Sequence, residues 1–117
     1  MRESVTYDKA KAFGVRIVRM YQWLSNEKKE YVLSKQCLRS GTSIGANLSE
    51  GMNGQSRADF VAKMHIALKE AYETDYWLEL MRETDYLETK VYESLHNDCV
   101  ELIKLLTSSI KTNKEKL

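Results

Sequence analysis

Apolar residues recur at helical spacing through four separate segments of this chain, and this pattern limits the possible fold more than any other feature. It is most regular over residues about 89–110, in a seam of Val91, Leu95, Cys99, Leu102, Leu106 and Ile110. Similar seams run through residues about 6–24, 30–50 and 56–84. Because short connections between long helices favour antiparallel neighbours, the sequence predicts an all-α fold, an antiparallel up-down-up-down four-helix bundle.

Length and composition agree with a single domain over residues 1–117. The chain has no proline, and its length suits one domain with one core. No apolar run is long enough to cross a membrane, and the N-terminus lacks an apolar signal region. Cys37 and Cys99 have no metal-ligand spacing, so we expect reduced core thiols. We therefore expect a cytoplasmic protein with no cofactor, no bound metal and no membrane contact.

Local signals mark where the helices begin and end. Ser56 and Asp59 resemble a capping box that starts the third helix. Gly51 and Gly54, around an asparagine, readily adopt left-handed conformations, so the second helix should end there. The polar tail, residues 111–117, should fray.

The second segment is unusual because small residues occupy much of it. Gly41 and Gly45 lie four apart on one helical face, and each costs about 1 kcal/mol relative to alanine. A surface this low lets a neighbouring backbone approach closely. Two explanations remain open at this point, namely close packing against the first or third helix and contact with another subunit. The residues assigned to this packing are Ser40, Gly41, Ile44, Gly45 and, in the third segment, Trp77.

Two parts of the chain also resemble a known protein family. The run Leu38–Gly51, LRSGTSIGANLSEG, resembles the signature of the bacterial four helix bundle protein family, also called the 23S rRNA-intervening sequence protein family. Its members were first noticed as products of intervening sequences in large-subunit ribosomal RNA genes. Three further runs resemble the family's third helix: Ser56–Phe60, Ile66–Ala71 and Glu73–Leu78. The chain departs from the family at Asp75, where glutamate is common, and in a loop at residues 52–55 that is often more basic.

The resemblance implies an assembly more clearly than a reaction. It implies an antiparallel four-helix bundle that forms a ring-shaped homopentamer. The family is also similar to accessory variability proteins of diversity-generating retroelements, which work with a reverse transcriptase and its RNA. No catalytic residues are assigned to the family, so none is implied for this chain. The partners implied are other copies of the chain, RNA or DNA, and a reverse transcriptase or another protein.

Charge is nearly balanced over the whole chain but unevenly distributed along it. Residues 1–63 hold 11 basic and 6 acidic side chains, a net charge of +5, whereas residues 64–117 hold 7 and 11, a net charge of −4. A basic half can mark a binding face, or it can attract the acidic half of the same chain. Rows of cations neutralise phosphates without reading base sequence. We predict that nucleic acid binds a basic face formed by Lys9, Arg16, Arg19, Lys35 and Arg39.

Other motifs point only weakly to chemistry. Glu93 and His96 have the spacing of a di-iron helical bundle, but the second such motif that this site needs is missing. Four carboxylates of the third segment are expected to pair with the basic half instead: Glu70, Glu73, Asp75 and Glu79. We therefore expect a non-enzymatic, homo-oligomeric adaptor that binds structured nucleic acid, RNA in preference to DNA. The alternative is a protein-binding scaffold or accessory subunit without nucleic-acid contact.

Overall fold

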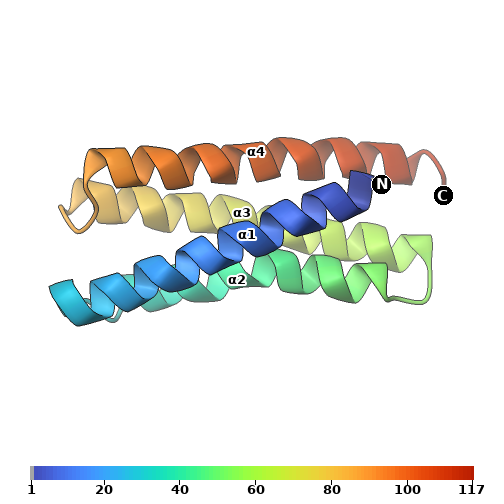
Figure 1. Ribbon diagram of the computed structural model, residues 1–117. Coiled ribbons are helices and arrows are strands. Elements are labelled where there is room, and N and C mark those ends of the chain that lie inside the picture. The colour runs from blue at the N-terminus through green and yellow to red at the C-terminus, as the bar shows by residue number, and fades with distance from the viewer. Residues whose placement is uncertain (1) are drawn as a thin grey trace.

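Four long helices lie side by side in an elongated body of 46 × 21 × 19 Å (Figure 1). The computed structural model describes residues 2–117, with side chains from residue 5 onward. A π-helical turn, η1 (Leu24–Lys28), follows the first helix. The helices are α1 (Arg2–Trp23), α2 (Leu33–Met52), α3 (Arg57–Glu83) and α4 (Thr89–Lys114). Since residues 2–117 contain no strand, the expected all-α fold is confirmed.

The helices are not equally close to one another. The chain reverses direction at each connection, which brings the N- and C-terminal ends to the same end of the molecule (Figure 1). α2 packs extensively on both α1 and α3, whereas α1 contacts α4 over a smaller part of its length. α1 lies beside α4 near its own N-terminus and crosses toward α2 at its C-terminal end (Figure 1). None of the described helices is both long and apolar enough to cross a membrane.

The predicted seams meet in one apolar core. Phe13 and Ile17 of α1 and Ile44 of α2 are at most 2% exposed. From the α4 seam, the structure buries Leu95, Cys99, Leu102, Leu106 and Ile110. The prediction that Val91 belongs to the same buried seam was wrong. Its side chain is 42% exposed, because α1 has moved away from α4 at this end of the bundle.

The start of α2 differs from the prediction because Glu30 caps this helix instead of beginning it. The Glu30 carboxylate accepts hydrogen bonds from the backbone N–H groups of Val32, Leu33 and Ser34, at 3.0, 3.0 and 2.7 Å. Burial by itself would raise the pKa of Glu30, but these N–H groups more than offset it and lower the pKa from its ordinary value of 4.5. Lys29, with φ of 54°, makes the reversal that places Glu30 there.

The other helix ends agree with the sequence signals in part. The Asp59 N–H donates to the Ser56 hydroxyl at 3.1 Å, so the predicted cap of α3 is confirmed. The prediction that Gly51 and Gly54 adopt left-handed conformations was wrong, because no described glycine has positive φ. Gly51 lies inside α2. The expected fraying after residue 110 was also wrong. α4 continues to Lys114, and the buried Asn113 side chain accepts a hydrogen bond from Arg57 at 2.6 Å.

Glycine lets α2 lie close to α1. A Cβ added to Gly41 would stand 2.9 Å from both Cγ atoms of Ile17, which is closer than real side chains pack. At Gly45 a Cβ would be 3.7 Å from the backbone of Ala10, an ordinary contact distance. The two glycines therefore differ, since only Gly41 stands where a side chain would push the helices apart.

Small residues also bring α2 close to α3. The Thr74 hydroxyl donates to the Ser40 hydroxyl at 2.8 Å within the buried interface between the two helices. A Cβ on Gly51 would lie 2.8 Å from the Phe60 ring near the connection between them. α2 thus approaches both neighbours through its smallest residues.

Alanine at Gly41 and at Gly45 should have different effects on stability. Gly45→Ala should raise the free energy of unfolding by up to about 1 kcal/mol, because alanine favours the helix and its Cβ fits. Gly41→Ala gains the same propensity but overpacks Ile17, at a cost of about 1–3 kcal/mol, so it should be the less stable variant. Urea unfolding monitored by circular dichroism measures both. Equal stability of the variants would contradict the packing at Gly41.

The Glu30 cap should make stability depend on pH. Because the folded state holds the Glu30 pKa below 4.5, the cap stabilises the fold above pH 4.5 and is lost as pH falls through the lowered pKa. Glu30→Gln should therefore be less stable than the parent protein at pH 7, by about 1 kcal/mol. The difference should shrink as pH falls below 4.5, in unfolding curves recorded from pH 7 to pH 3. A constant difference would contradict this role.

Candidate functional site

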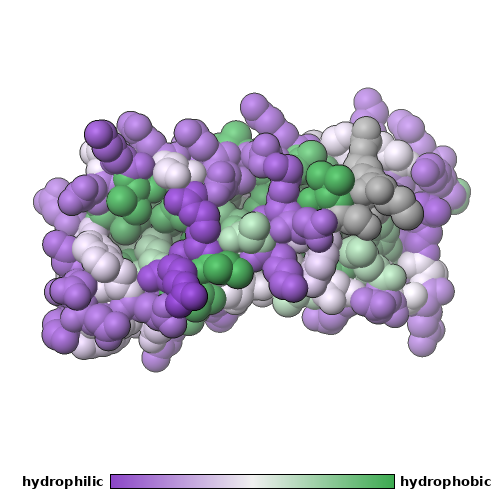
Figure 2. All heavy atoms as spheres, in the orientation of Figure 1, coloured by the Kyte–Doolittle hydropathy of each residue, from purple (hydrophilic) through white to green (hydrophobic). Residues whose placement is uncertain are grey.

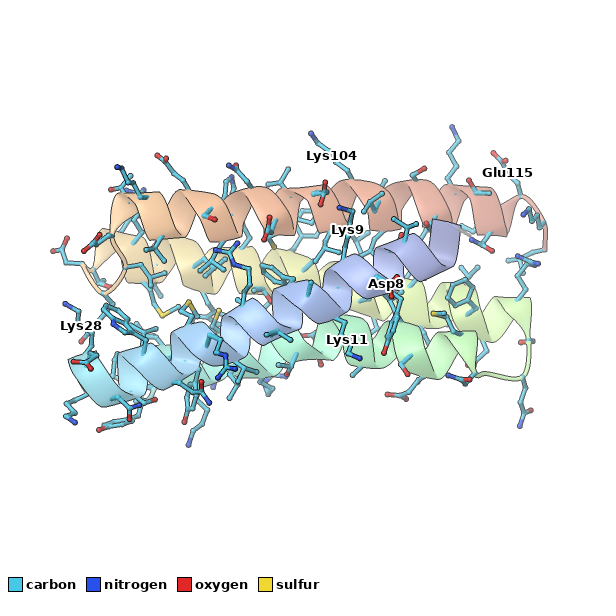
Figure 3. The ribbon with its side chains drawn as sticks, viewed as in Figure 1. Asp8, Lys9, Lys11, Lys28, Lys104 and Glu115 are labelled. Atoms are coloured by element: carbon cyan, nitrogen blue, oxygen red, sulfur yellow. The ribbon has the colours of Figure 1, made fainter. Side chains whose placement is uncertain are left out.

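The five cations assigned to a nucleic-acid face lie on several sides of the bundle. Lys9 and Arg16 face α4, where the Lys9 Nζ is 3.2 Å from Glu101 and the Arg16 guanidinium is 2.6 Å from Asp98. Figure 3 shows Lys9 directed from α1 toward α4. These two cations are already paired with carboxylates within the chain.

Arg16 joins α1 to α4 through more than one bond. Its Nη1 donates to Asp98 at 2.6 Å, and its Nη2 donates to the Ser94 hydroxyl at 2.9 Å. A guanidinium fork can make such paired contacts, whereas a lysine ammonium presents a single point charge. Arg16 thus acts as a polar bridge across the seam where the two helices pack less closely.

Arg39 lies at the seam between α2 and α3. Its Nη2 is 2.9 Å from a Glu73 oxygen, and the same oxygen accepts a hydrogen bond from the Trp77 indole at 3.4 Å. Trp77 also meets the Tyr76 ring edge-on, with centroids 5.1 Å apart. Trp77 is therefore half-buried in a polar and aromatic surface cluster, next to Tyr76.

Among residues 5–117, three ion pairs join the basic half of the sequence to its acidic half, namely Lys9–Glu101, Arg16–Asp98 and Arg39–Glu73. Attraction between the two halves was one of the two explanations for the uneven charge distribution. These ion pairs are contacts of the kind that this explanation requires. Among the third-segment carboxylates, the expected pairing holds for Glu73 but was wrong for Asp75, which contacts His96 of α4 at 2.7 Å. Glu70 is 8% exposed, and no described residue forms an ion pair with it.

A shallow groove of about 580 Å³ runs between α1 and α2. Its lining is mainly apolar and combines four small residues, two valines, three hydroxyl-bearing side chains and two cations: Ala10, Gly14, Gly45, Ala46, Val15, Val18, Tyr7, Thr42, Ser49, Lys11 and Arg19. Figure 3 shows Lys11 directed over α2. Neither Lys11 nor Arg19 has a carboxylate partner among residues 5–117, and the same holds for Lys35, which is exposed on α2.

A second groove, the α1/α4 groove, has a volume of about 600 Å³ and is mainly apolar. Its lining residues are Val15, Arg16, Arg19, Met20, Trp23, Leu87, Glu88, Val91 and Leu95. Figure 2 shows hydrophobic surface at the end of the molecule where α4 begins, beside α1. The sequence did not predict this groove, because helical periodicity carries no information on the angle at which α1 and α4 diverge. Trp23, outside the predicted seam of the first helix, was the available signal.

His96 contacts side chains of both α3 and α4. Its Nδ1 is 2.7 Å from Asp75, and its ring stacks on Tyr92 at a centroid distance of 5.3 Å. The Arg82 guanidinium lies 5.0 Å from the centre of the Tyr92 ring. Burial, and then the charges of Asp75 and Glu79, raise the pKa of the Tyr92 phenol. Across residues 5–117 no three His, Cys, Asp or Glu side chains are grouped to hold a metal ion.

Both cysteines are buried thiols. Burial raises the pKa of Cys37, and it raises the pKa of Cys99 to about 12. The Cys99 thiol donates to the backbone oxygen of Ala71 at 3.2 Å, so it forms part of the contact between α3 and α4. Because the thiolate is the reactive form, neither cysteine has the environment of a nucleophile.

The fold agrees with the family resemblance noted in the sequence, in the number of helices, the small-residue surface of α2 and the cap of α3. Comparison with known proteins then tests whether the chain belongs to that family. The family model of the 23S rRNA-intervening sequence protein matches residues 2–108. The chain belongs to this family. A crystal structure of a protein with unknown function, from the S23 ribosomal protein family of Bacteroides thetaiotaomicron VPI-5482, is 58% identical. The match covers 95% of this chain and 99% of that one, with a TM-score of 0.93. No curated protein matches significantly.

The bridge between α1 and α4 predicts different effects for two nearby arginines. Arg16→Ala should lower the free energy of unfolding by about 1 kcal/mol, because it removes the bonds to Asp98 and Ser94 at a partly exposed site. Arg19→Ala should change it by less than about 0.5 kcal/mol, since no carboxylate among residues 5–117 pairs with Arg19. Chemical denaturation of both variants tests this. A larger loss in Arg19→Ala would contradict it.

Proposed function

We propose that this antiparallel up-down-up-down bundle is a non-enzymatic, homo-oligomeric adaptor that binds structured nucleic acid, RNA in preference to DNA. The assembly we propose is the homopentamer implied by the family resemblance. One observation carries the nucleic-acid proposal. Lys11 and Arg19 line the groove between α1 and α2, Lys35 is exposed on α2, and none of the three has a carboxylate partner among residues 5–117.

The groove suits a polyanion for physical reasons. Small residues at Gly45 and Ala46 leave room for a sugar-phosphate backbone to approach, while the Thr42 and Ser49 hydroxyls line the same groove. Unpaired cations gain most from neutralising phosphates, because their binding breaks no existing ion pair. The five cations predicted from the sequence therefore divide into Arg19 and Lys35, which are available for phosphate, and three that are paired with carboxylates of the same chain.

Lys9, Arg16 and Arg39 contribute to this surface in a secondary way. Each is partly exposed although it is paired, with exposed side-chain fractions of 46%, 39% and 61%. A phosphate that contacts one of them competes with the carboxylate that holds it. In a ring of identical subunits every copy would repeat the surface, which would strengthen its attraction for a polyanion.

The alternative is a scaffold or accessory subunit for a protein, for instance a reverse transcriptase, without nucleic-acid contact. The apolar α1/α4 groove supports this second function, because large exposed apolar surfaces mark protein contacts. The two functions predict different dependences of binding affinity on salt concentration. Phosphate binding weakens steeply with salt, whereas apolar docking changes little.

Binding of a fluorescent RNA hairpin should depend on Lys11 and Lys35. Titrations at several salt concentrations should give affinities that fall steeply as salt rises. The double variant Lys11→Gln/Lys35→Gln should reduce the slope of log affinity against log salt concentration by about 2, since each lysine neutralises about one phosphate. Thermal stability should not change, because no side chain among residues 5–117 forms an ion pair with Lys11 or Lys35. Arg19 stays intact in this test because it also borders the α1/α4 groove.

Lys104→Gln is the matched control, since Lys104 projects from the outer side of α4 (Figure 3). It should leave the affinity and the salt slope close to those of the parent protein. Lack of hairpin binding at low salt would contradict the nucleic-acid function. Equal losses in the double variant and in Lys104→Gln would contradict its assignment to the α1/α2 surface.

A further inference from the structure

We propose that the groove between α1 and α2, the α1/α2 groove, holds an unpaired nucleotide of the bound RNA. The base lies inside the groove, and the flanking phosphates contact Lys11 and Arg19. The inference deepens the proposed function, because it rests on nucleic-acid binding at this surface and names the part of the RNA that enters it.

The lining of the α1/α2 groove suits a base better than a phosphate. Tyr7, Val15 and Val18 line it together with four small residues. Charged phosphates gain nothing from apolar surface, so phosphate binding by itself does not account for this lining. The faces of a nucleobase are apolar, and they stack on aromatic rings whatever the base. The volume of about 580 Å³ lies within the range of small-molecule sites, roughly 300–1,000 Å³.

Gly14 is small for no reason that the bundle itself supplies. It lies inside α1, where glycine weakens a helix relative to alanine. A Cβ added to Gly14 would meet no heavy atom of a neighbouring described element within 4 Å, whereas a Cβ on Gly41 would overlap with Ile17. Yet Gly14 lines the α1/α2 groove. A side chain there would fill the groove without disturbing the packing of the helices, so this glycine leaves room for an occupant from outside the chain.

Two unpaired cations lie along the same groove. Lys11 and Arg19 are exposed, and no carboxylate among residues 5–117 forms an ion pair with either. Lys11 is directed over α2 (Figure 3), and Arg19 donates to the neutral side-chain amide of Gln22 at 3.2 Å. The two cations are eight residues apart, which is about 12 Å along the helix axis. Because both side chains are long, they can reach the phosphates on either side of one nucleotide whose base points inward.

Charge favours an anionic occupant. The lining residues of the α1/α2 groove, taken from the described part of the chain, include no carboxylate, whereas Glu88 lines the α1/α4 groove. Asp8 and Glu50 directly follow lining residues in the sequence, but neither lines the groove, and Glu50 pairs with Lys63 of α3 at 3.2 Å. A nucleotide here meets two cations and no opposing charge in the lining, which favours it over an apolar or basic peptide.

The paired parts of an RNA cannot use the groove in this way. In a duplex the base faces are stacked on one another, so phosphates, riboses and base edges alone reach a protein surface. A duplex would therefore leave the apolar lining and the space above Gly14 empty. Unpaired nucleotides of loops and bulges can turn a base outward and stack it on an aromatic side chain. The occupant is thus a loop or bulge nucleotide.

Two fluorescent RNA hairpins with the same number of phosphates test this inference. One carries a bulge of adenosines, and the other carries the same bulge with the bases removed. The protein should bind the intact bulge about tenfold more tightly than the abasic bulge, because base stacking is lost in the second. The dependence of affinity on salt should be the same for both hairpins, because their phosphates are identical.

Filling the groove should remove the preference for the intact bulge. Gly14→Leu places a side chain where a Cβ has open space, and Ala46→Leu does so at an exposed lining position of α2. Both variants should bind the two hairpins with equal affinity. Gly14→Leu should also unfold at a higher temperature than the parent protein, since leucine favours a helix more than glycine does. A more stable variant that has lost the preference separates base binding from folding.

Ala62→Leu is the matched control, because Ala62 is an exposed alanine of α3 outside the groove. It should keep the preference of the parent protein. Thermal unfolding should confirm that every variant folds, and either filling variant suffices if the other does not. Equal affinity of the parent protein for the two hairpins would overturn the inference, as would a preference that survives in a folded filling variant.

The same titrations distinguish this inference from the proposed function. Absence of binding to either hairpin at low salt would overturn both. Equal binding of the two hairpins with a steep dependence on salt would overturn the unpaired nucleotide and leave nucleic-acid binding standing. Free AMP that binds as tightly as the intact hairpin would assign the groove to a mononucleotide, and it would overturn the contact with RNA.

Discussion

The close approach of α2 to α1 is the constraint on which the rest of the arrangement depends. Gly41 leaves no room for even a methyl group against Ile17, so the two helices are set at a separation that larger residues would not allow. On its other side α2 reaches α3 through the Ser40–Thr74 hydrogen bond and through Gly51. α2 is thus the element against which both neighbours are positioned.

Because α1 packs closely on α2, its packing against α4 on the opposite side is incomplete. As α1 follows α2, it moves away from α4, and apolar packing alone does not close the seam between them (Figure 1). Through the middle of α1 the seam is bridged by the ion pairs of Lys9 and Arg16. Toward the C-terminal end of α1 it opens into an apolar groove. Packing at one helix pair therefore creates the exposed surface at another.

The same contacts decide which charges remain available for a partner. Of the five cations that the sequence placed on a binding face, three are occupied by carboxylates of α3 or α4. The pairing is a property of the bundle, since Arg16 and Asp98 are 82 residues apart in sequence. What is left for phosphate is a narrower surface around Lys11, Arg19 and Lys35, and Arg19 also borders the apolar groove.

Local physics explains which sequence predictions held. The cap at Ser56 and the apolar seams depend on residues within one or two helical turns, so they could be recognised along the chain. Glu30 looked like the first residue of a helix because glutamate is a good helix former, yet its carboxylate accepts the N–H groups of the helix that follows. The C-terminal tail looked free to fray because its partner Arg57 lies 56 residues earlier.

The sequence by itself determined four helices, most of their core residues and the family, because periodicity, caps and the Leu38–Gly51 signature are all local patterns. Only the tertiary structure decided that Gly41 meets Ile17 while Gly45 lines an open groove, although both glycines lie on the same helical face. It also decided which cations are neutralised and where α1 leaves α4. These outcomes depend on the angle and spacing between helices, which arise from packing that residues distant in sequence share.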